Sequence, residues 1–252
     1  MTSRLPALPW LEPGDPFPAV EQAWSVGTPA PGLLAAGGAL DVASLVTAYG
    51  NGIFPWFSDG QPILWWSTDP RMVLRVDALR LHRSMRKTLS RFASAPGCEV
   101  RIDSAFEQVI SACALTSRRG QPGTWILPEM VAAYTALHAA GLAHSVETWV
   151  HDELVGGLYC VALGQMVFGE SMFSTAADAS KIALAGLVAF CRENGLPQID
   201  CQQNTAHLAS LGAAEMPRAE FVKQVRILTQ LPCPDWHFEP LYWNHLLAPK
   251  AM

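Results

Sequence analysis

Three strand-like segments joined by tight turns constrain the fold more than any other feature. The segments are residues 143–150, 154–163 and 166–173. His151-Asp152-Glu153 turns the chain in the first gap, and Gly164-Gln165 turns it in the second. Connections this short join antiparallel neighbours, because a parallel pair needs a crossover of roughly a dozen residues. The sequence therefore predicts an antiparallel meander.

An apolar helix and a short strand follow the meander. Lys181–Glu193 has the composition of a buried helix, with Asp178 or Ser180 as its N-cap. A strand over Gln198–Gln202 comes next, and then a helix near Thr205–Leu211. A meander followed by helix, strand and helix is the layout of acyltransferase domains of the GNAT type, which is an analogy of fold alone.

The first 70 residues differ in character from the rest. Residues 1–70 are rich in Pro, Gly and Trp, with a helix expected over Asp41–Tyr49. Prolines limit residues 53–57 and 62–66 to edge strands or loops. We predict a small N-terminal domain there. Residues 71–252 should form an α/β (α+β) domain whose mixed, largely antiparallel sheet is flanked by helices.

Composition indicates a soluble globular protein. Half of the 252 residues are apolar and 15% are charged, which supplies a core and disfavours disorder. Prolines interrupt the N-terminal segment, and no apolar run reaches the roughly 18 residues of a membrane span. The six cysteines are scattered, and no His/Cys cluster has metal-ligand spacing. We expect a cytoplasmic protein with reduced cysteines, no metal and no membrane partner.

The net charge of −5 hides a local excess of positive charge. Ten of the 17 Lys and Arg residues lie between positions 71 and 119, namely Arg71, Arg75, Arg80, Arg83, Arg86, Lys87, Arg91, Arg101, Arg118 and Arg119. A basic stripe on an acidic protein is suited to a phosphate backbone. A solvated helix face would have the same pattern, so both interpretations stay open.

Two polar positions on predicted strands are candidates for chemistry. Asp200 and Gln202 should share one face of their strand. There they could orient an amine and handle its proton, or they could be a polar pair that ends the strand and has no catalytic role. Glu170 interrupts an apolar strand, so its carboxylate meets either a protein cation or a substrate ammonium. A Cys201 nucleophile paired with His207 is disfavoured, because a strand cysteine facing away from Asp200 is more often buried and inert.

The aromatic residues suggest one pocket candidate, and a missing loop argues against one class of enzyme. Most of the aromatic set is expected in the core, namely Trp56, Trp65, Trp66 and Tyr134. Trp125 follows a loop and is a better pocket candidate. The glycine-rich loop that holds the pyrophosphate of coenzyme A is absent between a strand and a helix. An ordinary acetyl-CoA enzyme is therefore disfavoured.

Ordered motifs from about residue 30 to 220 resemble the leucyl/phenylalanyl-tRNA–protein transferase family. They are Gly52-Ile53-Phe54-Pro55-Trp56-Phe57, Leu64-Trp65-Trp66-Ser67, Asp69-Pro70-Arg71, Gly123-Thr124-Trp125-Ile126, His144-Ser145-Val146-Glu147, Leu154-Val155-Gly156-Gly157, Gly169-Glu170-Ser171-Met172-Phe173-Ser174, Ala179-Ser180-Lys181, Ile199-Asp200-Cys201-Gln202 and Ser210-Leu211-Gly212-Ala213. The resemblance implies a GNAT-like C-terminal domain that uses aminoacyl-tRNA in place of acyl-CoA. The implied activity transfers Leu or Phe, less readily Met, to proteins with N-terminal Arg or Lys and marks them for degradation, without a cofactor.

The resemblance also implies roles for individual residues. The catalytic pair maps to Asp200 and Gln202. The substrate-binding set maps to Trp56, Trp125, Tyr134, Leu158, Val167, Phe168, Glu170 and Leu187. The tRNA-binding set maps to Arg71, Arg75, Arg80, Arg83, Arg86, Lys87 and Arg91. We hypothesise that Asp200 orients Gln202, which holds the acceptor amine against the ester; whether Asp200 is also a base stays open.

At two positions the sequence departs from the family pattern. The family often has Phe where Val167 stands and Met where Leu158 stands, which bears on the preference between Leu and Phe. The cationic side chain of the acceptor's Arg or Lys needs an acidic neighbour. The candidates are Glu170, Glu147 and Asp178, and the sequence does not rank them.

Two rival functions stay open. One is an acyltransferase that uses other aminoacyl-tRNAs; the other, ranked last, is a non-catalytic tRNA-binding module.

Overall fold

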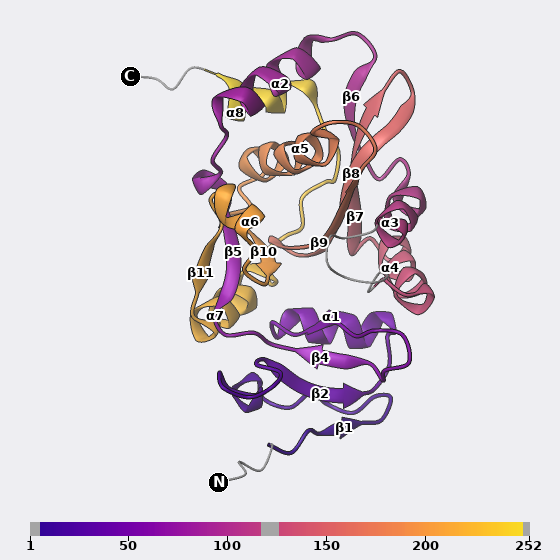
Figure 1. Ribbon diagram of the computed structural model, residues 1–252, viewed down its shortest axis with the longest axis vertical. Helices are drawn as coiled ribbons and strands as arrows, with labels where there is room; N and C mark the ends of the chain where they lie inside the picture. The colour runs from indigo at the N-terminus through magenta and orange to yellow at the C-terminus, as the bar shows by residue number, and fades with distance from the viewer. Residues whose placement is uncertain (1–5, 117–125, 249–252) are drawn as a thin grey trace.

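The chain folds around two β-sheets, one small and one large (Figure 1). The computed structural model describes residues 6–116 and 126–248, so Trp125, Arg118 and Arg119 lie outside the described residues. Within these ranges, no helix is both long and apolar enough to cross a membrane.

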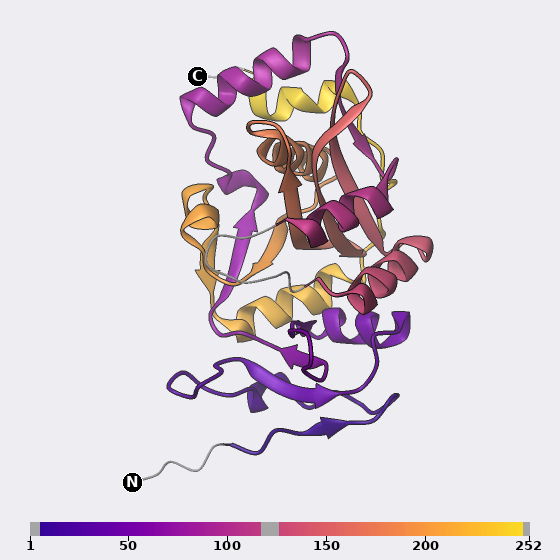
Figure 2. The same ribbon diagram turned by 45° about the vertical axis from the view of Figure 1, so that its right-hand side comes forward.

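The small sheet is built from the N-terminal part of the chain, in the strand order β1-β2-β4-β3. Its strands are β1 (Trp10–Leu11), β2 (Leu33–Gly37), β3 (Phe54–Pro55) and β4 (Leu64–Trp66). Pro55 lies on the edge strand β3, as its missing N–H group requires. Helix α1 (Val42–Gly50) begins where Asp41 Oδ1 accepts a hydrogen bond of 2.7 Å from the Ser44 amide. Figures 1 and 2 show α1 between this sheet and the larger one.

The large sheet has seven strands in the order β11-β5-β10-β9-β8-β7-β6. Its strands are β5 (Arg71–Arg75), β6 (Cys98–Ile102), β7 (Ala143–Val150), β8 (Glu153–Leu163), β9 (Met166–Ser174), β10 (Gln198–Gln202) and β11 (Ala214–Met216). Strands β10 and β9 run parallel, and all other neighbours run antiparallel. The predicted meander is β7-β8-β9, and the prediction of a mixed, largely antiparallel sheet flanked by helices is confirmed.

Helices cover both faces of the large sheet. They are α2 (Arg83–Ser94), α3 (Phe106–Leu115), α4 (Pro128–Ala139), α5 (Ala179–Glu193), α6 (Ala206–Ser210), α7 (Arg218–Leu228) and α8 (Asn244–Leu247). Short 3₁₀ helices occur at Val20–Gln22, Val76–Ala78 and Pro240–Trp243. Helix α5 packs on β7 and β8 from one side, with α8 against it, while α3 and α4 contact the sheet from the other side.

Two buried apolar clusters follow from this layering. The α5-side cluster contains the α5 residues together with Leu158 and Val167. The shared cluster contains Tyr159 and Phe168, the residues next to those two, and extends through α3, α4 and α7 into the N-terminal part. Adjacent strand residues therefore reach opposite clusters, as the period of two requires.

The start of α5 differs from the sequence prediction. Asp178 has a left-handed backbone, with φ of 61°, and its side chain caps no helix N–H group. It instead accepts a hydrogen bond of 2.7 Å from Lys181 Nζ. Ser180 lies inside the helix, whose close approach to β8 depends on Gly156: a Cβ there would lie 2.5 Å from the Ala179 Cβ.

Candidate functional site

A buried ion pair joins β5 to its sheet neighbour β10. Arg71 donates from Nε to Asp200 Oδ1 at 2.8 Å and from Nη2 to Oδ2 at 2.7 Å, and both residues are 0% exposed. The guanidinium also donates to the Gly52 carbonyl at 3.2 Å. The rings of Phe54 and Phe221 each lie 4.6 Å from it. The bidentate pairing and these contacts are what allow two charges to be buried together.

Arg71 therefore does not belong to the exposed tRNA-binding set predicted from the sequence. Its guanidinium is inaccessible to solvent and forms an ion pair with Asp200, so it cannot bind an external phosphate. Arg71 opens the basic run in the sequence, but in the structure its side chain lies buried on β5, an interior strand beside the edge strand β11.

Asp200 is positioned as an orienting group. Besides the two bonds from Arg71, its Oδ1 accepts a hydrogen bond of 3.0 Å from the backbone N–H of Gln202. Both carboxylate oxygens are thus used inside the protein, and neither reaches solvent. A carboxylate held in this way is poorly placed to take a proton from a substrate.

Gln202 ends β10 in an unusual conformation. The register of β10 against β5 shifts between Asp200 and Gln202, and Gln202 has φ of 55°. This bulge invalidates the alternation argument by which the two side chains were predicted to share a face. The Gln202 carbonyl accepts a hydrogen bond of 3.1 Å from Thr68 Oγ1. Its Nε2 is buried and has no hydrogen-bond partner among the described residues.

Such a buried and unpartnered amide is uncommon, because an unmet donor costs free energy. The catalytic candidates thus comprise a carboxylate held by three hydrogen bonds and a neighbouring amide nitrogen without a hydrogen-bond partner among the described residues.

A second polar cluster joins α1, α4 and β9. Tyr49 Oη donates to Glu170 Oε1 at 2.7 Å, and Tyr134 Oη donates to Glu170 Oε2 at 3.2 Å. The two hydroxyl oxygens lie 2.5 Å apart. Burial raises the pKa of Glu170 from 4.5 to about 7; the Tyr49 hydrogen bond opposes this rise, and the negative charge of Asp200 adds to it. Burial also raises the pKa of both tyrosines, so both hydroxyls stay protonated.

The structure separates the three acidic residues that the sequence left unranked. Glu147 is fully buried, and its carboxylate accepts hydrogen bonds from the Ser104 hydroxyl, the Ala105 amide at 2.8 Å, the Ser145 hydroxyl at 2.7 Å and the Trp149 indole at 3.0 Å. Asp178 is paired with Lys181. Glu170 is partly buried and forms no ion pair with a residue that the structure describes.

The predicted substrate-binding set divides between the two faces of the large sheet. Leu158, Val167 and Leu187 belong to the α5-side cluster. Tyr134 and Phe168 belong to the shared cluster, against which the half-buried Trp56 packs. The prediction at Trp125 lies outside the described residues. These positions therefore form two groups, and only the group in the shared cluster contacts Glu170 directly, through Tyr134.

The rival nucleophile is disfavoured by its surroundings. Burial raises the pKa of the Cys201 thiol from 9.0 to about 12, and the nearby charge of Asp200 raises it further. Its thiolate, the nucleophilic form, is therefore scarce near neutral pH.

Helix α2 presents most of the remaining basic set. Arg83, Lys87 and Arg91 are exposed at a spacing of four residues, which places them on one face of the helix. Neither these three nor the exposed Arg80 forms an ion pair with a described residue. Arg75 is exposed but lies 3.4 Å from Asp77 Oδ1. Arg86 donates to the Leu246 carbonyl of α8 at 2.7 Å.

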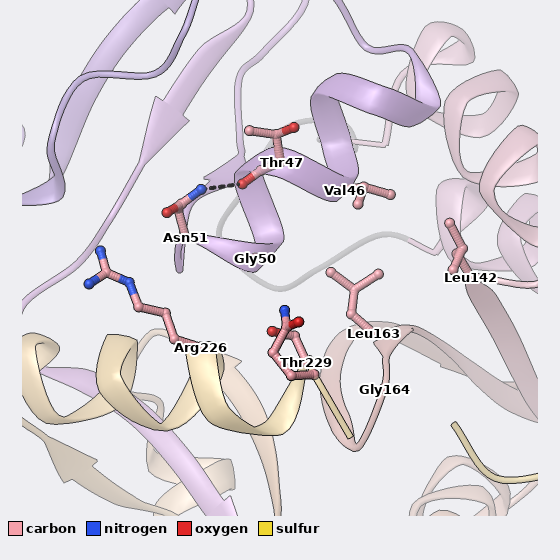
Figure 3. Close-up of a pocket in the computed structure, with 10 residues that line it drawn as sticks. Val46, Thr47, Gly50, Asn51, Leu142, Leu163, Gly164, Arg226 and Thr229 are labelled. Atoms are coloured by element: carbon pink, nitrogen blue, oxygen red, sulfur yellow. Dashed lines mark hydrogen bonds between the residues drawn. The ribbon is translucent and has the colours of Figure 1, made fainter. Parts of the chain in front are cut away.

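A cavity of about 580 Å³ lies apart from these residues (Figure 3). It opens between α1, the β8–β9 turn and the end of α7, where Val46, Gly164 and Arg226 are among its lining residues. None of the predicted catalytic or substrate-binding residues lines it. Among the described residues, no group of three or more His, Cys, Asp or Glu side chains is arranged to hold a metal ion.

The family models and the most similar curated relatives agree on one family. Residues 73–226 match the family model of leucyl/phenylalanyl-tRNA protein transferase, and residues 38–69 match the model of its N-terminal domain. A leucyl/phenylalanyl-tRNA–protein transferase of Albidiferax ferrireducens is 61% identical over 100% of this chain and 99% of its own length. One from a Polaromonas species is 62% identical over 96% of this chain and 94% of its own. A crystal structure of FemX covers 70% of this chain and 66% of its own, at 11% identity and a TM-score of 0.46.

Proposed function

Because the chain belongs to the leucyl/phenylalanyl-tRNA–protein transferase family, we propose that it transfers Leu or Phe, and less readily Met, from charged tRNA to proteins that begin with Arg or Lys. The chain is an aminoacyltransferase. From this use of charged tRNA we infer that it acts in the cytoplasm, and its products would be marked for degradation. The observation that carries the proposed mechanism is the Arg71–Asp200 pair beside the unpartnered amide of Gln202.

The reaction needs positioning more than activation. The α-amino nitrogen of the acceptor attacks the ester carbonyl carbon, a C–N bond forms, and the C–O bond to the ribose breaks. The nitrogen loses one proton and the ribose oxygen gains one, so the step balances without a co-reactant. An α-amino group has a pKa of about 7.7–8.0, so part of it is already neutral near pH 7. Holding amine and ester together then supplies most of the rate enhancement.

Gln202 is the group best placed to contact the reacting ester. Its unpartnered atom is an N–H donor, which needs an acceptor oxygen from the substrate. The ester carbonyl oxygen gains negative charge as the amine attacks, so a fixed donor beside it stabilises the transition state more than the ground state. Asp200 holds the backbone of Gln202, and Arg71 holds Asp200.

Glu170 is the carboxylate that we assign to the acceptor's cation. Glu147 already accepts four hydrogen bonds and Asp178 is paired with Lys181, whereas Glu170 is partly exposed and lacks a cationic partner among the described residues. An ionised carboxylate in partly desolvated surroundings attracts an Arg or Lys side chain more strongly than one in bulk water.

The test is transfer of radiolabelled leucine from Leu-tRNA to two peptides that differ only in their first residue, Arg or Ala. Label on the Arg peptide alone supports donor, acceptor and reaction together. Equal labelling of both peptides would refute the acceptor assignment. No label on either peptide, with intact Leu-tRNA and label transferred from another aminoacyl-tRNA, would favour the rival acyltransferase.

A further inference from the structure

We propose that Tyr49 is a positioning residue for the transfer reaction, whose hydroxyl holds the carboxylate of Glu170 in place for the substrate. Tyr49 lies in the last turn of α1 and was not among the residues singled out from the sequence. The inference rests on the proposed function, because it assigns Tyr49 a role through the acceptor-binding carboxylate.

The three polar groups share too few protons for every contact to be a full hydrogen bond. With Glu170 ionised, two hydroxyl protons serve three contacts, of 2.5, 2.7 and 3.2 Å. The short contacts are satisfied when Tyr134 donates to Tyr49 and Tyr49 donates to Glu170 Oε1. Glu170 Oε2 is then only a weaker second acceptor of the Tyr134 proton, at 3.2 Å, and its lone pairs remain available to another donor.

The ring of Tyr49 is fixed by its surroundings. It is 0% exposed and packs against Phe168, with ring centroids 4.9 Å apart. Phe168 lies two residues before Glu170 on β9, so the same strand that supports the ring also presents the carboxylate. The N-terminal part of the chain therefore contributes a side chain to a cluster whose other two polar members come from α4 and β9.

A purely structural role for Tyr49 would predict a different outcome. A buried hydroxyl needs a partner, and Glu170 could serve as that partner without any effect on substrate. Glu170, however, has no ion pair with a described residue, so the Tyr49 hydrogen bond is a main stabiliser of its charged form. Loss of the hydroxyl should then raise the pKa of Glu170 and change the pH range in which it binds a cation.

The experiment compares wild type, Tyr49→Phe and a matched control, Tyr242→Phe. Tyr242 is also buried, and its hydroxyl makes one contact of 3.0 Å with His237 Nε2 in the C-terminal segment. Carbon-13 NMR of protein labelled at the glutamate carboxyl carbon follows the titration of Glu170, with Glu170→Gln identifying its signal. The acceptor's kcat/KM is measured from pH 6 to pH 9 in the same variants.

We expect Tyr49→Phe to raise the Glu170 midpoint above the wild-type pKa of about 7. Its kcat/KM should be several-fold lower at pH 7 and recover toward wild type at pH 9, while Tyr242→Phe matches wild type throughout. Tyr134→Phe, which leaves the Tyr49–Glu170 bond intact, should raise the midpoint less.

An unchanged Glu170 midpoint in Tyr49→Phe, or an equal loss in Tyr242→Phe, would overturn the proposal. Failure of the proposed function is distinguishable, because wild type itself would then not label the Arg peptide. The NMR titration does not depend on enzyme activity. It measures the effect of the Tyr49 hydroxyl on the Glu170 midpoint whether or not the proposed function holds.

Discussion

At the scale of single residues, the site depends on charges that are placed inside the protein and fully occupied there. Arg71 and Asp200 are desolvated, and burying them is compensated by a bidentate contact and by two aromatic rings over the guanidinium. The same contacts make Asp200 a rigid support for Gln202. Rigid support is what a residue aimed at a transition state requires.

Replacing Arg71 should expose this dependence. Arg71→Met leaves Asp200 buried without its cation, so we expect the free energy of unfolding to fall by about 3–5 kcal/mol. Urea denaturation followed by circular dichroism measures the change. Arg75→Met is the control, because Arg75 is exposed and its pair with Asp77 is solvated. Equal stability of the two variants would contradict the account.

The pH dependence of Glu170 gives a second residue-scale prediction. Its pKa of about 7 means that the carboxylate is protonated below that pH and charged above it. Acceptor binding should therefore strengthen as the pH rises through about 7, and Glu170→Gln should remove this change while leaving any that comes from the acceptor's α-amine. The acceptor KM measured across pH 6–9 checks the direction. A wild-type KM that does not change with pH would show that Glu170 does not bind the acceptor's cation.

At the scale of elements, α2 is the surface best suited to tRNA. Arg83, Arg86 and Lys87 lie in the first turns of the helix, where the macrodipole disfavours cations, and no acidic residue accompanies them there. Positive charge kept at an unfavourable position is more readily explained by an external anion than by the stability of the helix.

Neutralising this face should weaken tRNA binding. Arg83→Ala combined with Lys87→Ala should lower affinity for Leu-tRNA and reduce the slope of log affinity against log salt by about 1 per lost phosphate contact. Arg101→Ala is the control, because Glu99 and Asp152 already neutralise that arginine. Equal wild-type affinity at 50 and 200 mM salt would refute binding dominated by phosphate contacts.

Elements were more predictable from the sequence than the contacts between them. The alternation of residues 143–173 and its turns indicated β7, β8 and β9 nearly to their observed ends. The Tyr49–Glu170 contact spans 121 residues and the Arg71–Asp200 contact spans 129, and no local pattern marks either pairing. The bulge at Gln202 was equally invisible, because strand periodicity assumes that pairing continues unbroken.

At the scale of the whole molecule, the two sheets share one core. The strands of the small sheet all precede residue 70 and those of the large sheet all follow it. Domains at 1–70 and 71–252 remain our proposal. Yet the shared cluster contains Trp65 and Tyr49 from the first part beside Tyr134 and Phe221 from the second. Separating the parts would expose this apolar surface and the Glu170 cluster to water.

The shared core predicts cooperative unfolding. We expect one calorimetric transition for the full chain, and we expect a fragment of residues 71–252 to be unfolded or aggregated on its own. Differential scanning calorimetry, with circular dichroism of the fragment, provides the check. Two separate transitions, or a folded fragment, would show that the parts are independently stable.

The most direct test of the central claim is the rate of leucine transfer by Gln202→Ala at saturating Leu-tRNA and acceptor peptide. Removing a donor to the developing oxyanion should lower kcat by about 10²–10³, with Asp200 and Arg71 still paired and stability nearly unchanged. A raised acceptor KM with an intact kcat would contradict the account, because Gln202 would then bind the acceptor without stabilising the transition state.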